Sequence, residues 1–329
     1  MTTVRITGTG SFLPERVLTN FDLEKLVDTS DEWILKRTGI RERRQARPDQ
    51  SASDLGKDAA QKALVQAKME PENLDLLVMA TITPDTCCPS GANWLERKLS
   101  ANRALSFDVT AACCGFLFGL SVAEQYLKSG TYTNALVVAA EVMTRTVNWQ
   151  DRASCILWGD GAGAVVLDSG KGDGAEILST KVHSDGSKGE NLLMPGGGSR
   201  TTPICHESVD RGLHYLQLVE APATFRVAVE YFTLACEEAL ETNGLTPDQI
   251  DLYIPHQANI RIIQAMARKL QVPMERIFVN LDRYGNMSSA SMAIALDEAR
   301  RNGRLKKGDL VLLCGFGGGL TWGSSLILW

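Results

Sequence analysis

The cysteine at position 113 occupies a place in the sequence where a thiol could act as a nucleophile. It follows an expected strand that ends with Phe-Asp-Val at 107–109, and an expected helix begins two residues later at Gly115. Unpaired backbone N–H groups and the positive end of the helix dipole at such a helix start favour the thiolate over the thiol. A buried structural cysteine is the alternative, and these residues alone leave open whether Cys113 or Cys114 faces a site.

A histidine, an asparagine and three glycines follow expected strands or turns further along the chain. His256 lies in Pro-His-Gln-Ala-Asn at 255–259, after an expected strand at 252–254, and such strand ends form ligand crevices in α/β sheets. The amide of Asn286, within Arg-Tyr-Gly-Asn-Met-Ser at 283–288, could donate to a carbonyl oxygen, although Gly-Asn by itself is typical of a turn. The glycines at 317–319 let a substrate approach the backbone and free an N–H group for an oxyanion, unless they form only a flexible turn.

A group of arginines and a group of glycines each allow a functional and a purely structural interpretation. The arginines at 37, 41, 43 and 44 follow Trp33 closely and could grip phosphates while a base stacks on the indole, or they could form a solvated charged face. The glycines at 159–163 lack the G-x-G-x-x-G spacing of a dinucleotide site, so we expect them to serve packing.

Composition argues against several other classes of protein. The chain has 329 residues, 44% of them hydrophobic, and a formal net charge of −5, which gives no indication of binding to bulk nucleic acid or an anionic membrane. The first residues lack the apolar run of a secretory signal, and no stretch approaches the roughly 18 apolar residues of a membrane-spanning helix. The eight cysteines and four scattered histidines fit neither a disulfide framework nor a metal site. We therefore expect a cytoplasmic protein without a metal.

Expected strands and helices alternate along the chain, which predicts an α/β fold with covered sheets. Strands are expected at 4–7, 74–80, 104–109, 135–140, 164–167, 252–254 and 310–313, and helices at 55–68, 91–99, 115–128 and 225–241. The segment Pro-Glu-Asn-Leu-Asp-Leu at 71–76 is repeated as Pro-Asp-Gln-Ile-Asp-Leu at 247–252, an offset of 176 (247 minus 71). This repeat predicts two similar halves, 1–172 with Cys113 and 173–329 with His256 and Asn286, and a site shared across a pseudo-twofold axis.

The motifs in combination resemble one family. They are Asp-Val-Thr-Ala-Ala-Cys at 108–113, Pro-His-Gln-Ala-Asn at 255–259, Tyr-Gly-Asn-Met-Ser at 284–288 and Phe-Gly-Gly-Gly-Leu-Thr-Trp-Gly at 316–323. Together they resemble β-ketoacyl-acyl-carrier-protein synthase III of the thiolase superfamily, over essentially the whole chain. The resemblance implies a thiolase-like, duplicated five-layer α/β/α/β/α fold, a homodimer and no cofactor. It also implies decarboxylative condensation of an acyl-CoA, acetyl-CoA by default, with malonyl-acyl carrier protein at the start of fatty acid synthesis.

The resemblance assigns roles residue by residue. Cys113 matches the nucleophile, His256 and Asn286 match the other catalytic positions, and the N–H groups of Cys113 and Gly318 match the oxyanion hole. The positions that match coenzyme A contacts are Thr29, Trp33, Arg37, Arg152, Phe225, Asn259 and Phe316, with adenine between Trp33 and Arg152. The positions that match carrier-protein contacts are Arg226 and Arg261, which Arg268 and Lys269 could join. The acyl pocket is expected at Cys88, Met143 and Trp158.

Departures from the family pattern bear on the choice of primer. Cys88 stands where a bulky aromatic residue of the partner subunit caps the acyl pocket in some members, which could open room for longer or branched chains. Trp158 stands where a smaller aromatic residue is usual and could close that room, and Leu320 replaces a common Phe. The irregular stretch 195–212, longer than in the short members, is either functional or merely tolerated.

Four alternatives remain for the activity. A starter enzyme of secondary metabolism that uses a longer or branched acyl group would carry the same catalytic residues. A thiolase-type enzyme needs a second cysteine beside the triple glycine, but Cys314 is one residue out of place and would face the opposite side of its strand. The remaining two alternatives are not condensing enzymes. One is a thioester hydrolase with a Cys-His-Asn triad, and the other is a catalytically inactive scaffold.

Overall fold

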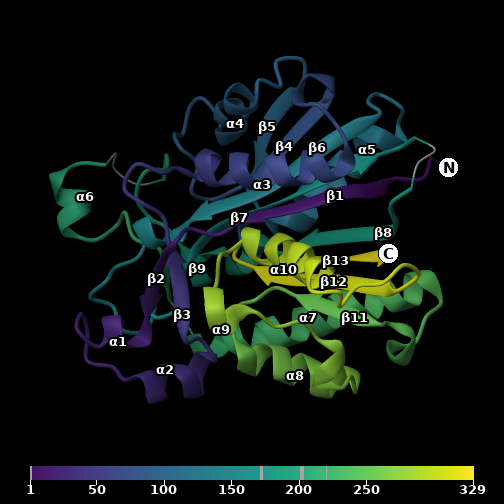
Figure 1. Cartoon of the computed structure of the whole chain (residues 1–329). Coiled ribbons are helices and arrows are strands. Elements are labelled where there is room, and N and C mark those ends of the chain that lie inside the picture. Colours follow the sequence, from purple (N-terminus) through teal and green to yellow (C-terminus); the bar gives the residue numbers. More distant parts are fainter. Residues whose placement is uncertain (1, 171–172, 201–203, 220) are drawn as a thin grey trace.

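The computed structural model describes residues 2–170, 173–200, 204–219 and 221–329 (Figure 1). Within these residues nine strands form a sheet in the order β11-β12-β13-β8-β1-β7-β6-β4-β5. The strands of the first half are β1 (Arg5–Phe12), β4 (Leu76–Ala80), β5 (Leu105–Val109), β6 (Asn134–Val142) and β7 (Asp160–Asp168). Those of the second half are β8 (Ala175–Ser184), β11 (Leu252–Pro255), β12 (Leu310–Gly317) and β13 (Thr321–Leu328). A short antiparallel pairing of β1 with β8, at Arg5–Glu176 and Ile6–Ala175, joins the two sets.

Helices cover both sets of strands and fill the space between them. Helices α3 (Ala52–Ala67) and α4 (Gly91–Leu99) lie on the outer face of the first set, and α7 (Ala221–Asn243) and α8 (Ile260–Leu270) lie on the outer face of the second (Figure 1). Helices α5 (Gly115–Lys128) and α10 (Ala290–Arg301) pack between the two sets. The expected five-layer thiolase-like arrangement is therefore confirmed.

The sequence dictates these layers through strands that are apolar on both sides. Strands β4 and β6 are buried along their whole length. Val78 and Val137 point into the core around α5 and α10, whereas their neighbours Leu77 and Val138 point into the core under α3 and α4. Successive side chains of a strand face opposite sides, so a continuous apolar run supplies two helical layers at once.

The observed elements are close to the expected ones, with a few differences. Helices α4 and α5 have the predicted bounds. Strand β1 continues beyond the expected strand at 4–7. It includes Gly8, where a Cβ atom would lie 2.1 Å from the carbonyl oxygen of Ala63, so the missing side chain lets α3 lie directly on the strand. Strand β7 includes the glycines at 159–163 almost entirely, and a Cβ atom at Gly163 would lie 2.5 Å from the Cβ of Ala293 in α10, which confirms that these glycines serve packing.

The smaller elements lie near one end of the layers. Strands β2 (Arg16–Thr19) and β3 (Glu42–Gln45) form a hairpin-like pair next to α1 (Asn20–Leu23) and α2 (Asp31–Thr38), and α9 (Leu281–Tyr284) contacts β3. The stretch expected to be irregular at 195–212 contains a short helix, α6 (His206–Asp210), which projects from the body in Figure 1; residues 201–203 of that stretch lie outside the described residues. Strands β9 (Leu192–Leu193) and β10 (Gln217–Leu218) pair at its base.

Candidate active site

A cavity of about 610 Å³ opens between α2, α7 and α8 and ends at the turns that follow β5, β11 and α9; we call it the central cavity. It brings together most of the residues singled out in the sequence, although they come from segments far apart in the chain. Those that line it are Trp33, Arg37, Cys113, Trp158, Phe225, Arg226, His256, Asn259, Arg261, Asn286, Phe316, Gly317, Gly318 and Leu320.

Cys113 lies at the inner end of the central cavity, on a single 3-10 turn (Ala112–Cys114) that leads directly into α5. Ala112 has a φ of 45°, a left-handed conformation that turns the chain sharply before the cysteine. Gly317 at the end of β12 lies against this turn, because a Cβ atom there would be 2.8 Å from the Cys113 backbone nitrogen. Cys114 points the other way, and its thiol donates to the carbonyl of Thr321 at 3.5 Å.

The expectation that the helix start favours the thiolate does not hold for the free protein. Cys113 is 5% exposed, and burial raises the pKa of its thiol to about 12. Removal from water disfavours the charged form and here outweighs the helix dipole. The resting cysteine is thus a neutral thiol.

His256 follows β11 at the same end of the cavity. It is 1% exposed, and neither of its ring nitrogens has a hydrogen-bond partner among the described residues. Burial lowers the pKa of the imidazole to about 3, so the ring is neutral and carries one N–H donor. Two unpartnered polar atoms in a buried position are costly, which indicates that the ring is built to meet a ligand.

Asn286 lies on the turn between α9 and α10, and this turn is held in one geometry. Its side-chain oxygen accepts from the N–H of Ser288 at 2.8 Å, and Ser288 itself has a left-handed φ of 48°. Gly285, with a φ of 67°, precedes it. Because the oxygen is occupied, the amide NH₂ group is the part of Asn286 that remains to donate into the cavity.

The mouth of the central cavity is cationic and partly exposed. The guanidinium groups of Arg37 and Arg152 lie 4.6 and 4.1 Å from the centroid of the Trp33 ring. Arg152 thus stacks on the indole face where an adenine was expected between the two residues, so a base can enter this slot only if the guanidinium moves. Thr29, which precedes α2, has a buried hydroxyl without a partner among the described residues but does not line the cavity.

Several other expected contacts lie at the same opening. The guanidinium of Arg261 lies 6.0 Å from the Phe225 ring, and Phe316 is buried against the aromatic ring of Tyr231. The Asn259 side chain is already used, since it caps α8 and donates to the carbonyl of Arg37 at 3.0 Å.

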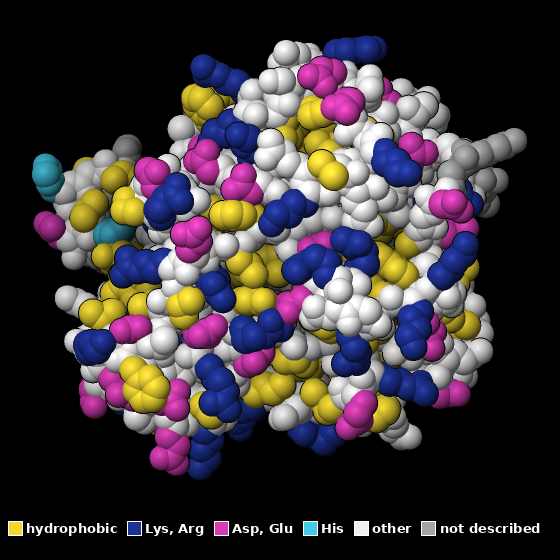
Figure 2. Space-filling view, in the orientation of Figure 1, with side chains coloured by type: hydrophobic (Ala, Val, Ile, Leu, Met, Phe, Trp, Pro, Cys, Tyr) yellow, Lys and Arg dark blue, Asp and Glu magenta, His cyan; other side chains and the backbone are white. Residues whose placement is uncertain are grey.

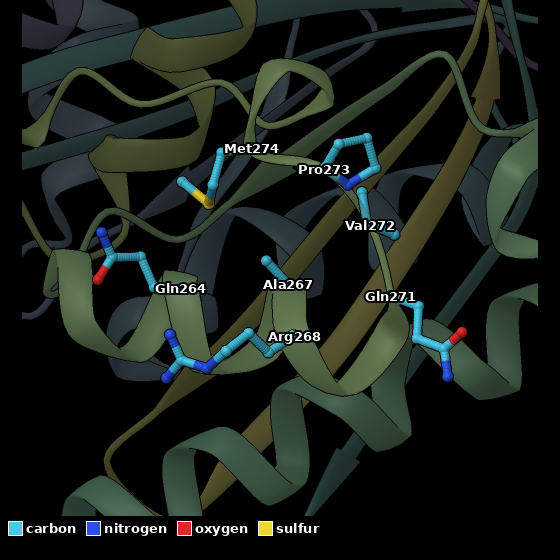
Figure 3. A pocket seen from close by; sticks show the side chains of 7 residues that line it. All are labelled: Gln264, Ala267, Arg268, Gln271, Val272, Pro273 and Met274. Atoms are coloured by element: carbon cyan, nitrogen blue, oxygen red, sulfur yellow. The ribbon is translucent and has the colours of Figure 1, made fainter.

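Arg268 and Lys269 are not part of this opening. Arg268 lies beside a separate hollow at the far end of α8, which Gln264, Ala267, Gln271, Val272, Pro273 and Met274 also line (Figure 3). Lys269 is exposed on the same helix. On the face shown in Figure 2, basic and acidic side chains are interspersed and do not gather into one large patch.

The three residues expected in the acyl pocket have different positions. Trp158 lines the cavity next to Asn286, with which it forms an isolated bridge. Met143 is fully buried in the hydrophobic cluster that includes Trp158. Cys88 is exposed, follows β4 on the 81–90 segment and does not line the cavity of its own chain.

The arginines after Trp33 do not act as one group. Arg43 is fully buried; it donates to the Asn20 side chain at 2.7 Å and to the carbonyl of Ile156, and burial lowers its pKa to about 10. It therefore braces the cavity wall near Ile156 and cannot grip a phosphate. Only Arg37 of the four lines the cavity.

Sequence reasoning missed several parts of the site. Leu192 of β9 and Leu218 of β10 line the cavity, and Ser288, Ser289 and Glu141 support the turns around it. The two leucines lie around the irregular stretch 195–212, where no periodic pattern could reveal their pairing.

The described residues hold neither a metal site nor a membrane-spanning helix. No group of three or more metal-ligating side chains is placed to hold an ion. No helix in the described ranges has the length and apolar character needed to cross a membrane.

Two family models match parts of this chain, and known proteins match nearly all of it. The model for 3-oxoacyl-[acyl-carrier-protein] synthase III matches residues 107–186, and the model for its C-terminal part matches residues 240–329. A β-ketoacyl-[acyl-carrier-protein] synthase III from Caldanaerobacter subterraneus subsp. tengcongensis is 50% identical over 98% of this chain and 97% of its own. One from Alkalilimnicola ehrlichii is also 50% identical, over 99% of both chains.

Solved structures agree with these matches. The 3-oxoacyl-[acyl-carrier-protein] synthase III from Aquifex aeolicus is 44% identical, with a TM-score of 0.90 over 99% of this chain and 100% of its own. The priming β-ketosynthase from the R1128 polyketide biosynthetic pathway is 36% identical, with a TM-score of 0.89 over 99% of this chain and 96% of its own. The chain with the buried Cys113, His256 and Asn286 thus belongs to the β-ketoacyl-acyl-carrier-protein synthase III family.

Proposed function

We propose that this protein condenses an acyl-CoA primer, acetyl-CoA by default, with malonyl-acyl carrier protein to give a 3-oxoacyl-acyl carrier protein, the first step of fatty acid synthesis. The observation that carries the proposal is the shared end of the central cavity, where Cys113, His256 and Asn286 meet behind a cationic mouth. Cys113 is the nucleophile, and His256 and Asn286 are hydrogen-bond donors.

The first half-reaction transfers the acyl group to Cys113. The sulfur attacks the thioester carbonyl, and the N–H groups of Cys113 and Gly318 stabilise the oxyanion. The thiol is neutral at rest, so its proton must leave as the carbon–sulfur bond forms. The carbon–sulfur bond to coenzyme A then breaks, and the departing thiolate takes up this proton.

The second half-reaction forms the carbon–carbon bond. The malonyl thioester loses CO₂, and the resulting enolate oxygen accepts hydrogen bonds from the neutral His256 ring and from the NH₂ group of Asn286. Each such donor contributes about 3 kcal/mol to the transition state. The enolate carbon attacks the acyl carbonyl, and the Cys113 thiolate leaves. Neither half-reaction transfers electrons to or from an external acceptor or donor, and the oxyanion and the enolate are stabilised by N–H donors. The steps as written therefore require no metal or redox cofactor.

The mouth of the cavity supports the proposed partners. Trp33, Arg37 and Arg152 would hold the nucleotide end of coenzyme A, and Thr29, Phe225, Asn259 and Phe316 would lie along the pantetheine arm. Arg226 and Arg261, which point from α7 and α8 toward the mouth, would meet an acidic carrier protein. Arg268 and Lys269 would extend that contact along α8.

The proposal includes the setting of the enzyme. The halves 1–172 and 173–329 would act as two related units, one supplying Cys113 and the other His256 and Asn286. The enzyme would be a cytoplasmic homodimer in which Cys88 of one subunit faces the acyl pocket of the other, beside Met143 and Trp158. An exposed Cys88 on a well-anchored segment supports this contact.

A specialised starter enzyme is the second candidate. The 36% identity to a priming ketosynthase of a polyketide pathway favours it, because that protein shares the fold and the length of this chain. The two candidates differ in the primer, since a starter enzyme would prefer a longer or branched acyl group.

Intact-mass measurement after incubation with straight C2 to C12 and branched acyl-CoAs tests the proposal, with Cys113→Ser as the variant and Cys114→Ser as its matched control. We expect an acyl adduct in the wild type and in Cys114→Ser and none in Cys113→Ser, and a 3-oxoacyl product once malonyl-acyl carrier protein is added. Preference for longer or branched primers would favour the starter enzyme. Free fatty acid as the sole product would overturn condensation in favour of a thioester hydrolase.

A further inference from the structure

A carboxyl group that the proposed reaction does not use lies buried near Cys113. Glu141 on β6 is 0% exposed. Its Oε2 accepts from the hydroxyls of Thr83 at 2.6 Å and Thr81 at 3.2 Å, and from the N–H of Ile82 at 3.1 Å. Its Oε1 lies 2.7 Å from the hydroxyl oxygen of Ser289 and accepts a longer bond, at 3.3 Å, from the same N–H of Ile82. None of these four partners is a basic side chain.

The hydrogens around Oε1 can be counted. The Ser289 hydroxyl has one hydrogen, yet its oxygen lies within bonding distance of two acceptors, Glu141 Oε1 and the carbonyl oxygen of Ala80 at 3.1 Å. If Glu141 carries a proton on Oε1, that proton goes to Ser289, whose own hydrogen goes to Ala80, and every group is satisfied. An ionised Glu141 would instead compete with Ala80 for a single hydrogen. Burial, which raises the pKa of Glu141, acts in the same direction.

Ser289 connects this carboxyl group to both catalytic turns. It is the residue before α10 and follows the left-handed Ser288, whose N–H holds the side-chain oxygen of Asn286. On its other side, the Ser289 Cβ lies 3.1 Å from the point that a Cβ atom at Gly115 would occupy, two residues after Cys113. Ser289 thus lies between the Asn286 turn and the Cys113 turn, and Glu141 holds it there.

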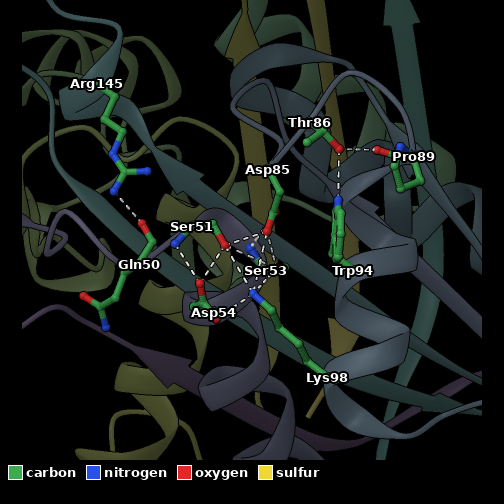
Figure 4. A network of polar contacts seen from close by, with 10 residues as sticks. All are labelled: Gln50, Ser51, Ser53, Asp54, Asp85, Thr86, Pro89, Trp94, Lys98 and Arg145. Atoms are coloured by element: carbon green, nitrogen blue, oxygen red, sulfur yellow. Dashed lines mark hydrogen bonds and ion pairs between the residues drawn. The ribbon is translucent and has the colours of Figure 1, made fainter.

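The other side of Glu141 is anchored just as firmly. The 81–83 segment that it binds runs on to Asp85, whose carboxylate accepts from the N–H of Ser53 at 3.1 Å and lies 3.7 Å from the Lys98 ammonium group (Figure 4). Lys98 also binds Asp54 in α3 at 2.5 Å. These contacts attach the 81–85 segment to α3 and α4. Glu141 therefore connects an anchored segment, through Ser289, to the turn that carries Asn286.

We propose that Glu141 is a protonated positioning residue that holds the Asn286 turn against the Cys113 turn through Ser289. A neutral acid suits this place, because the condensation builds negative charge on the enolate and on the leaving Cys113 sulfur. A carboxylate there would repel both charges. The inference rests on the proposed function of Asn286, and it adds a group that touches no substrate.

Three substitutions separate the possible roles of Glu141. Glu141→Gln replaces the protonated acid by a neutral amide of the same shape, whose NH₂ can donate to Ser289 and whose oxygen can accept the other donors. Glu141→Ala removes all contacts, and Ser289→Ala removes only the link to the turn. Glu124→Gln is the matched control, because Glu124 is another buried carboxyl group that bonds Lys128 within α5 and contacts neither turn.

The experiment compares condensation with acylation in each variant. We expect Glu141→Ala and Ser289→Ala to lower the condensation rate about tenfold or more, while the acyl adduct on Cys113 still forms at a rate within about threefold of the control. Glu141→Gln should restore condensation to within about threefold of the control. Condensation lost in a folded Glu141→Gln variant would overturn the proposal, since it would mean that the negative charge is required.

Two readouts do not depend on the proposed reaction. The infrared carbonyl band of a protonated carboxylic acid should be present at pH 7 and absent from Glu141→Gln. Alkylation of Cys113 by iodoacetamide, followed by peptide mass, should be equally fast at pH 7 in the wild type and in Glu141→Gln. An alkylation rate about tenfold higher in Glu141→Gln, one pKa unit of the thiol, would show that Glu141 is ionised and would overturn the proposal even if the enzyme proved to be a hydrolase.

Discussion

The inner end and the mouth of the central cavity are built in opposite ways. At the inner end Cys113, His256 and Asn286 are at most 5% exposed and lie on turns fixed by backbone contacts, such as the close approach of Gly317 to Cys113. At the mouth Arg37 and Arg261 are exposed, and Arg152 stacks on Trp33 with its charge 4.0 Å from Asp28.

The difference separates two tasks. The inner end has its donors in place before substrate arrives, so little reorganisation is needed while charge develops. The mouth must first release its own contacts, because Arg152 occupies the face of Trp33 that a nucleotide base would use. Chemistry should therefore be sensitive to single atoms at the inner end, and binding should respond in smaller, graded steps at the mouth.

The largest effect should appear in the reactivity of Cys113 without substrate. With its pKa raised to about 12, the thiolate fraction at pH 7 is about 3,000-fold below that of a free cysteine of pKa about 8.5. Since the folded pKa is raised, the fraction should rise about tenfold per pH unit up to pH 12. Iodoacetamide alkylation from pH 6 to 10, read by peptide mass, measures this slope. A plateau near pH 7 would mean that the inner end already holds a thiolate.

The next largest effect should come from the two donors. His256→Ala and Asn286→Ala should each lower condensation by about 10² to 10³, as the loss of one preorganised donor does elsewhere, and should leave most of the acylation of Cys113. Separate assays of the acyl adduct and of 3-oxoacyl product distinguish the steps. Equal losses of acylation and of condensation would show that His256 and Asn286 are needed for both steps and not mainly for condensation.

Most of the inner end could be predicted from the sequence because its chemistry lies in short contiguous motifs. Cys113 and His256 each follow an expected strand, and Asn286 lies in the short motif Tyr-Gly-Asn-Met-Ser at 284–288. The structure brings the three residues to one cavity. The fold followed from apolar runs that alternate with helices, for which packing leaves few solutions.

The parts that sequence could not predict depend on tertiary contacts. Whether Arg43 meets solvent or supports the wall at Ile156 depends on a strand pair and a loop more than 100 residues apart. The state of the Cys113 thiol depends on how completely its surroundings exclude water, which outweighs the helix start that the sequence does reveal. Glu141 belongs to an apolar strand and becomes notable only when Ser289 is found beside it.

At the mouth we expect smaller effects on binding. Trp33→Ala and Arg152→Ala should raise the KM for acyl-CoA about fivefold and change kcat little, because stacking contributes about 1 kcal/mol per contact. Arg152→Lys, which keeps the charge but loses the planar stack, is the matched control. Initial rates over a range of acyl-CoA concentrations measure the effect, and a fall in kcat of comparable size would contradict the separation of the two tasks.

The smallest effect should distinguish the two basic positions on α8. Arg261→Glu at the mouth should raise the KM for malonyl-acyl carrier protein several-fold more than Arg268→Glu, which lies at the separate hollow in Figure 3. Both effects should shrink in 0.5 M salt, since exposed charges are screened within about 4 Å at that ionic strength. Arg97→Glu, an exposed residue of α4 on the outer face of the first half, controls for the change in net charge. A larger effect at Arg268 than at Arg261 would place the carrier-protein contact at the far end of α8. Binding of the carrier protein would then depend on that part of the helix and not on the mouth of the cavity.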